Sequence, residues 1–202
     1  MASNLCCIVD ASGSMGVMRK YDQALKTAGS LAVLSSTPHT NVLDISAVTC
    51  WCWQQSLIAL REFKGPPTGQ ACLQSLLSFL SERYADATFL NDANALPFFL
   101  LFTDGRFYDQ EALMTVSAFW QQHPQLRLAI IGVGADQDEG ALHTLAGENG
   151  HVFSLQDIPA ALSYLRRRPL PVFSVIAEAI EPIIAASDAN SDDDDDDDAW
   201  DA

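Results

Sequence analysis

Three oxygen-bearing side chains occupy alternate positions near the start of the chain, in the motif Asp10-Ala-Ser12-Gly-Ser14. The motif follows the apolar run Leu5 to Val9, which is typical of a buried strand, and precedes a segment with a helical pattern. Alternate residues of an extended segment point the same way, and Gly13 permits a tight turn between them. Carboxylate and hydroxyl oxygens are hard ligands, so the motif predicts a site for Mg²⁺ or a similar cation.

Mg²⁺ takes about six ligands, so further oxygens must come from elsewhere in the chain. One source is Thr68, in the turn-forming stretch Pro66-Pro67-Thr68-Gly69 before a helical pattern. The other is Asp104, in Thr103-Asp104-Gly105 after the apolar run Pro97 to Phe102. A run that is apolar on both faces indicates a central parallel strand, and ligands bind at the carboxyl ends of such strands. The predicted site therefore comprises Asp10, Ser12, Ser14, Thr68 and Asp104.

This set of motifs in this order resembles the von Willebrand factor A family, and the resemblance covers roughly residues 3 to 168. In that family the matching positions form a metal-ion-dependent adhesion site. The resemblance implies that Ser12 and Ser14 are direct ligands, that Thr68 is a direct or switching ligand, and that Asp10 and Asp104 act directly or through water. One coordination position is left for a carboxylate from a partner protein. All five positions match the family pattern.

Each element also has a simpler structural interpretation. Asp10 or Ser14 could accept hydrogen bonds from the unpaired amides at the start of a helix, which is ordinary N-capping. Thr68 could cap the helix that follows it. The Thr103-Asp104-Gly105 stretch alone is an ordinary turn. The joint occurrence of these elements after apolar strands favours the metal site.

Apolar strand patterns alternate with helical patterns, which predicts an α/β fold: a Rossmann-like, doubly wound, mostly parallel sheet with helices on both faces. The strands before and after Cys50-Trp51-Cys52-Trp53 are joined by so short a link that they must be antiparallel, which gives one antiparallel edge strand. Strands are predicted at 5–9, 42–49, 54–60, 97–102, 126–133 and 151–154. Helices are predicted at 21–34, 71–84, 110–122, 139–146 and 158–168. Gly132-Val133-Gly134 lacks a third glycine for dinucleotide binding and is interpreted as a strand exit near the metal loops.

Composition agrees with one domain and a tail. The chain has 202 residues, of which 49% are hydrophobic, enough for a single core. Of its 26 acids, nine lie at Asp188, Asp192 to Asp198 and Asp201, which leaves 17 acids against 11 bases and a net charge of −6 for the rest. We expect a domain at 1–168, an apolar extension at 169–187 packed on the sheet or free to bind a partner, and a disordered tail at 188–202.

Several functional classes are disfavoured by the sequence. The only basic cluster is Arg166-Arg167-Arg168, so no basic stripe could follow a nucleic acid backbone. The first residues lack a basic region, and Leu5 to Val9 is too short for a signal peptide or a membrane span. The five cysteines show neither disulfide nor zinc spacing and are interpreted as small buried hydrophobes. We expect a cytoplasmic protein that binds neither nucleic acid nor membrane.

Two functions follow from the site. The favoured one is a non-enzymatic, metal-dependent interaction module that binds an Asp or Glu side chain of a protein partner through Mg²⁺, with Mn²⁺ or Ca²⁺ also possible. The resemblance suggests an AAA+ ATPase of the MoxR or chelatase type as partner, or a phosphorylation-linked stress-response system. A tail aspartate could also occupy the open metal position in an autoinhibitory way.

The alternative is a metal-assisted phosphoryl or ester hydrolase that uses the same site. A phosphotransferase with an aspartyl nucleophile at Asp10 would need a second acid two residues later, where the chain has Ser12. Neutral hydroxyl ligands leave a metal more attractive to an incoming carboxylate, which suits adhesion better than turnover.

Overall fold

A mostly parallel sheet organises the described part of the chain, which comprises residues 4–35, 44–52, 55–59, 65–84 and 98–166 of a computed structural model. The strand order is β3-β2-β1-β4-β5-β6. All neighbouring strands are parallel except β2 and β3, which are antiparallel. The strands are β1 (Asn4–Asp10), β2 (Asp44–Cys52), β3 (Gln55–Ala59), β4 (Phe98–Thr103), β5 (Arg127–Gly132) and β6 (Gly150–Ser154). The predicted sheet with one antiparallel edge strand is confirmed.

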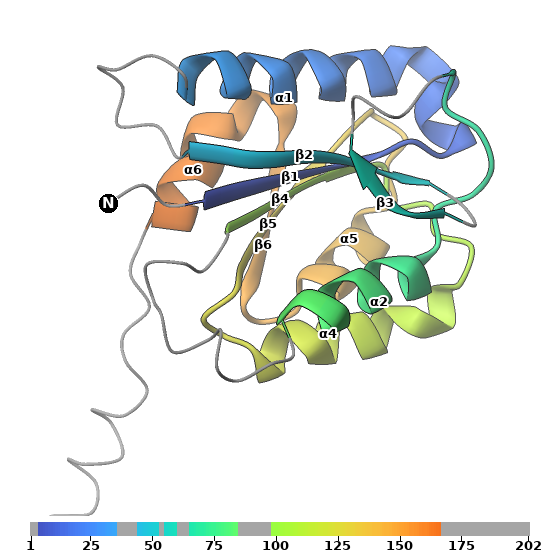
Figure 1. Ribbon diagram of the computed structural model, residues 1–202. Coiled ribbons are helices and arrows are strands. Elements are labelled where there is room, and N and C mark those ends of the chain that lie inside the picture. Colours follow the sequence, from blue (N-terminus) through green and yellow to red (C-terminus); the bar gives the residue numbers. More distant parts are fainter. Residues whose placement is uncertain (1–3, 36–43, 53–54, 60–64, 85–97, 167–202) are drawn as a thin grey trace, which may run out of the picture. The chain divides into compact units, whose positions relative to one another are not determined.

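Helices cover both faces of this sheet (Figure 1). One face carries α1 (Lys20–Ser35) and α6 (Ile158–Arg166), and the other carries α2 (Leu73–Tyr84), α4 (Leu113–Gln122) and α5 (Glu139–Ala146). Three short 3₁₀ segments complete the described helices: η1 (Gly13–Arg19), η3 (Gln110–Ala112) and η4 (Leu155–Asp157). This arrangement is the doubly wound fold that alternating strand and helix patterns predict.

Within the described residues, two apolar clusters form the core, one on each face of the sheet. Along β1, Cys6 and Ile8 point into the cluster with α2, α4 and α5, whereas Cys7 and Val9 point into the cluster with α1 and α6. This alternation is the two-residue period of a strand whose faces are both covered. Both cysteines are buried, as predicted, and burial raises the pKa of the Cys7 thiol, so it stays protonated.

The structure differs from the sequence-based prediction in the link between β2 and β3. Residues Cys50, Trp51 and Cys52 belong to β2, whereas the sequence suggested that they form the link. The strand continues because Cys50 and Trp51 pair with Val9 and Asp10 of β1. The connection between β2 and β3 is therefore confined to residues 53–54, which lie outside the described part, as do the predicted extension at 169–187 and the tail at 188–202.

Candidate metal centre

The carboxyl ends of β1 and β4 bring the two predicted aspartates to one edge of the sheet. The strands are parallel neighbours, with Val9 beside Phe102 in their register, so Asp10 and Thr103 follow side by side. Strand β1 pairs with β2 on its other side, and the chain order reverses between β1 and β4. Ligand sites of open α/β sheets lie at such a reversal point, so the fold places these residues where a site is expected.

The hydroxyls of Ser12 and Ser14 lie beside the carboxylate of Asp104. Their Oγ atoms are 3.0 Å apart, and Ser14 Oγ donates to Asp104 Oδ1 at 3.1 Å. Ser12 has extended backbone angles, whereas Ser14 lies within η1. The side chains therefore converge because the chain enters a 3₁₀ turn at Gly13, and not because an extended segment continues through Ser14 as the alternation suggested.

Asp10, like Asp104, has no exposed surface. Its Oδ1 accepts from the Ser12 amide at 2.8 Å, and its Oδ2 accepts from the Thr103 hydroxyl at 2.7 Å. Burial raises the pKa of Asp10 to about 6, although the hydrogen bonds from Thr103 and Ser12 act in the opposite direction. Thr103 thus belongs to the site, a role that sequence reasoning did not assign to it.

The loop that carries Thr68 is tied to the Asp10–Ser14 segment through its backbone. The Thr68 amide donates to the Ala11 carbonyl at 3.0 Å, and the Gly13 amide donates to the Gly69 carbonyl at 2.9 Å. A Cβ atom on Gly13 would lie 3.2 Å from that carbonyl oxygen, so glycine permits the close approach. The Thr68 side chain is exposed, and within the described residues it has no hydrogen bond to the Ser12, Ser14 and Asp104 group.

Helix α2 is capped by Asp109, so Thr68 is not needed as its cap. Asp109 Oδ1 accepts from the Leu73 amide at 2.7 Å, and Oδ2 accepts from the Gln74 amide at 2.8 Å. The loop after β4 is also joined to the residues before α2, because the Tyr108 amide donates to the Ala71 carbonyl at 2.9 Å. At the start of η1, Ser12 occupies the N-cap position without a side-chain capping bond. Of the residues considered as caps, Asp10 accepts from the Ser12 amide just before η1, whereas the Ser14 hydroxyl donates to Asp104.

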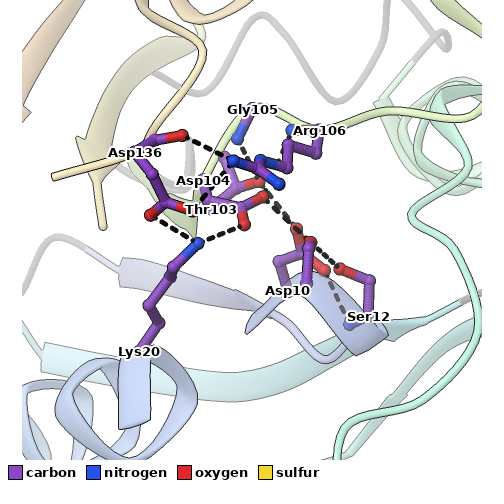
Figure 2. Close-up of polar contacts among 9 residues, drawn as sticks. Asp10, Ser12, Lys20, Thr103, Asp104, Gly105, Arg106 and Asp136 are labelled. Carbon is purple, nitrogen blue, oxygen red and sulfur yellow. Dashed lines mark hydrogen bonds and ion pairs between the residues drawn. The ribbon is translucent and has the colours of Figure 1, made fainter. Parts of the chain in front are cut away.

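A buried lysine adjoins the site from the opposite side of Asp104 (Figure 2). Lys20, the first residue of α1, is 1% exposed. Its Nζ lies 2.9 Å from Asp104 Oδ2 and 2.8 Å from Asp136 Oδ1. The second oxygen of Asp136 pairs with Arg106 Nη2 at 2.8 Å. Asp136 therefore bridges a buried cation and an exposed one.

Sequence reasoning missed Lys20 and Asp136, although one signal pointed to the lysine. Lys20 shares a helical face with Ala24, Ala28 and Leu31, which are all buried against the sheet. A lysine in register with an apolar face must find a counter-charge, because an unpaired buried cation is very costly. The acids that it meets are 84 and 116 residues away in sequence, so their identity could not be read from the local pattern.

A pocket of about 330 Å³ opens beside the two serines. Ser12 and Ser14 lie on its wall together with Arg106, which is half exposed, and Tyr108, which is 64% exposed. The other lining residues are Gly69, Gln70, Phe107, Gln110 and Asp138. The pocket thus reaches Ser14, which is partly exposed, and the buried Ser12, whereas Asp10 and Lys20 are not among its lining residues.

The donor set suits a hard divalent cation. Two buried carboxylates, Asp10 and Asp104, stand with the Ser12 and Ser14 hydroxyls within one hydrogen-bonded group. All of these donors are oxygens, which Mg²⁺, Mn²⁺ and Ca²⁺ prefer. Within the described residues no group of three or more His, Cys, Asp and Glu side chains could hold a metal, so hydroxyls would have to complete the site.

Comparison with known proteins supports the same fold. The family model for the von Willebrand factor type A domain matches residues 4–168. A search of curated proteins finds no match to the chain. In the described part of the chain, no helix has the length and apolar character that a membrane span requires.

Similar solved structures include the manganese-loaded TRAP protein of Plasmodium vivax, with a TM-score of 0.60 and 15% identity over 83% of this chain and 74% of that one. Proximal thread matrix protein 1 from the mussel byssus, with a zinc-occupied MIDAS motif, has a TM-score of 0.52 and 14% identity over 81% of this chain and 44% of its own. BatB of Bacteroides thetaiotaomicron has a TM-score of 0.50 and 11% identity over 81% of this chain and 98% of its own. At these identities the likeness establishes the fold.

Proposed function

Because this chain belongs to the von Willebrand factor type A domain family, we propose that it is a metal-dependent interaction module that binds an acidic side chain of a protein partner. The observation that carries the proposal is the hydrogen-bonded group of Ser12, Ser14 and Asp104, in which the two serines line an open pocket and the buried carboxylate of Asp104 lies behind them. A cation held there would present its positive charge to the pocket, where an incoming carboxylate could reach it.

We propose Mg²⁺ as the resident cation, with Mn²⁺ or Ca²⁺ as substitutes. Ser12 and Ser14 would bind it directly, and Asp10 and Asp104 would act directly or through water. Thr68 would join as a direct or switching ligand, which requires its exposed side chain to turn toward the serines. Two related folds carry manganese and zinc, which supports a divalent ion at this position of the fold. Bound there, the ion supplies an electrophilic centre for a carboxylate.

The pocket wall supports an acidic partner. Arg106 lines the same pocket as Ser12 and Ser14, and the contacts of its guanidinium with Asp136 use only Nη2. Arginine recognises carboxylates in a planar, two-point geometry. Tyr108 adds an exposed aromatic ring of the kind that anchors protein interfaces. The partner surface that fits this pocket therefore combines an acidic side chain with apolar neighbours.

We propose an intracellular partner, and the family resemblance favours an AAA+ ATPase of the MoxR or chelatase type. The proposed location is the cytoplasm. The partner class rests on analogy with the family, because fold alone does not specify function.

A hydrolase is the less favoured function. Both oxygens of Asp10 accept hydrogen bonds from the protein itself, so this carboxylate is not presented to a substrate as a nucleophile. Asp104 likewise has Lys20 at one oxygen and Ser14 at the other. These contacts hold the acids in place and favour a fixed binding site over turnover.

The test combines metal binding with binding of a defined acidic probe. The full chain is titrated with Mn²⁺ by calorimetry and then presented with an array of peptides that contain Asp or Glu, each paired with its Asn or Gln counterpart. We expect acidic peptides to bind in Mg²⁺ or Mn²⁺ and to be released by chelator. Asp104→Ala should abolish both metal binding and peptide binding.

The matched control is Asp22→Ala, which removes an exposed acid of α1 that is paired only with Arg19 among the described residues. It should bind metal and peptide as the wild type does. If wild-type protein takes up no divalent cation, the proposed metal site is wrong. If it takes up a cation but acidic peptides bind equally in chelator, the site has another role.

A further inference from the structure

We propose that Lys20 is an internal counter-ion of the cation site, which holds Asp104 in place without a metal and limits how tightly the site binds one. The proposal rests on the function proposed above, because it concerns the same metal site. The two carboxylate oxygens of Asp104 have different partners. One oxygen faces the serine hydroxyls, and the other contacts the Lys20 ammonium at 2.9 Å.

The fold makes specific provision for this lysine. Met18 and Arg19 have φ angles of 53° and 59°, so two successive side-chain-bearing residues adopt the left-handed conformation directly before Lys20. Such residues persist only where the surrounding structure requires them. Helix α1 begins at Lys20, directly after this turn. The Lys20 side chain extends from the helix toward Asp104 (Figure 2).

Gly134 provides the space that the lysine side chain occupies. Its φ is +97°, and a Cβ atom there would lie 2.8 Å from Lys20 Cε and 2.9 Å from Lys20 Cδ. Gly134, the last residue of the segment interpreted from the sequence as a strand exit, thus lies directly against the lysine side chain. A larger residue at this position would collide with the lysine side chain.

The charges around the lysine determine its effect on a cation. Asp10, Asp104 and Asp136 are the acids of this group, and Lys20 and Arg106 are its bases. Without a metal, the Lys20 ammonium offsets the charge of Asp104, which has no exposed surface. A metal held at the serine side would share this carboxylate with the ammonium, and the two positive charges would repel each other. The site is thereby kept ordered when empty and only moderately attractive to a cation.

The same charge also acts on the partner. A metal whose protein ligands carry less net negative charge retains more attraction for an external carboxylate. Lys20 is therefore a positioning residue that would shift the preference of the metal from the protein toward the partner. It neither lines the pocket nor contacts the Asp104 oxygen that accepts from Ser14.

Lys20→Met removes the charge and keeps most of the buried volume. We expect its Kd for Mn²⁺ to fall by about tenfold, which corresponds to 1.4 kcal/mol. In EDTA we expect a lower melting temperature than that of the wild type, and saturating Mn²⁺ should narrow this difference. Lys26→Met removes the same charge from an exposed position of the same helix and should change neither value.

Asp136→Asn provides a second variant with the opposite sign. It removes the other partner of Lys20 and leaves the ammonium to Asp104 alone, so the Kd for Mn²⁺ should rise by about threefold, a change of less than one decade. A residue with a purely structural role would weaken metal binding in both variants. Opposite shifts would support the counter-ion.

A folded Lys20→Met protein whose Kd equals or exceeds that of the wild type would overturn the proposal. If Lys20→Met does not fold, Asp136→Asn decides, and an unchanged or lower Kd would overturn it. Failure of the wild type to bind Mn²⁺ would instead remove the proposed function on which this inference rests.

Discussion

The Thr103 hydroxyl donates to Asp10 Oδ2 at 2.7 Å and so joins the ends of β4 and β1 across the centre of the sheet. The same oxygen of Thr103 accepts from the Gly105 amide at 3.2 Å, which begins the turn that presents Asp104. A single buried hydroxyl thus sets the relative position of the two acids. Its removal should affect both the stability of the sheet edge and the cation site.

Thr103→Val should lower the free energy of unfolding by about 2 kcal/mol, because a buried carboxylate loses a hydrogen-bond donor. It should also raise the pKa of Asp10 further, since this bond lowers that pKa in the wild type. Urea unfolding monitored by circular dichroism measures the first effect. Thr103→Ser keeps the hydroxyl and should remain within about 1 kcal/mol of the wild type; equal losses in both variants would contradict this role.

The metal-free protein should lose stability as the pH rises from about 4 to about 6. Asp10 has a folded pKa of about 6, above its ordinary value of 3.8, so the native state holds this proton more tightly than the unfolded state. Protonated Asp10 contributes up to about 3 kcal/mol to the free energy of unfolding. This contribution is fully present below the pKa of the unfolded state and is lost as the pH rises through the pKa of the folded state. Denaturation in EDTA across this range tests the expectation. In Asp10→Asn the loss of stability between pH 4 and pH 6 should be smaller. If the variant and the wild type lose the same stability over this range, Asp10 is not the group responsible.

Asp109→Ala should destabilise the protein by about 1 to 2 kcal/mol, because α2 loses the carboxylate that caps its first amides. The midpoint of urea unfolding should fall at an unchanged slope. Asp109→Asn retains one acceptor oxygen and should lose less. If alanine and asparagine behave alike, the capping bonds do not carry the effect.

Two glycine-to-alanine substitutions should change the stability of the protein in opposite directions. Gly13→Ala places a Cβ 3.2 Å from the Gly69 carbonyl oxygen and should push the Thr68 loop away, which weakens Mn²⁺ binding and stability. Gly29→Ala lies within α1, where the added Cβ meets no atom within 4 Å apart from its chain neighbours and the helix's own backbone, and should stabilise the helix by about 0.5 to 1 kcal/mol. Calorimetric melting and Mn²⁺ titration of both variants give the comparison. A stabilised Gly13→Ala variant with normal metal binding would show that the close approach is dispensable.

The fold could be predicted from the sequence because most of its helices and strands have clear local patterns of apolar residues. The continuous apolar run through Phe102 and the helical pattern at Glu139–Ala146 are both local signals; the helix formed at the predicted residues and the strand within one residue of them. The end of β2 was misread because Cys50 and Trp51 extend the strand through pairing with β1, a contact that local residue patterns do not contain. Tertiary pairing thus decided a boundary that propensity could not.

The sequence predicted only those residues of the candidate site that form a short motif or follow the end of a strand. Ser12, Ser14 and Asp104 meet as the motif order suggested, and the serine–aspartate contact could be anticipated. Asp136 and Lys20 could not be paired in advance, because each is an ordinary charged residue until the fold brings them to 2.8 Å. The position of Thr68 was predicted at the level of its loop, while its side-chain orientation depends on the rotamer and on what binds there.

The cap that Asp109 places on α2 has a consequence for the energetics of recognition. Asp109 belongs to the same loop as Asp104, and that loop is also joined to Ala71 through the Tyr108 amide. The part of this loop that lines the pocket is therefore fixed to the start of α2. Its backbone conformational entropy is lost when the protein folds and not when a partner binds. A partner that docks there has little ordering of this loop left to bring about, so more of its contact energy appears as affinity.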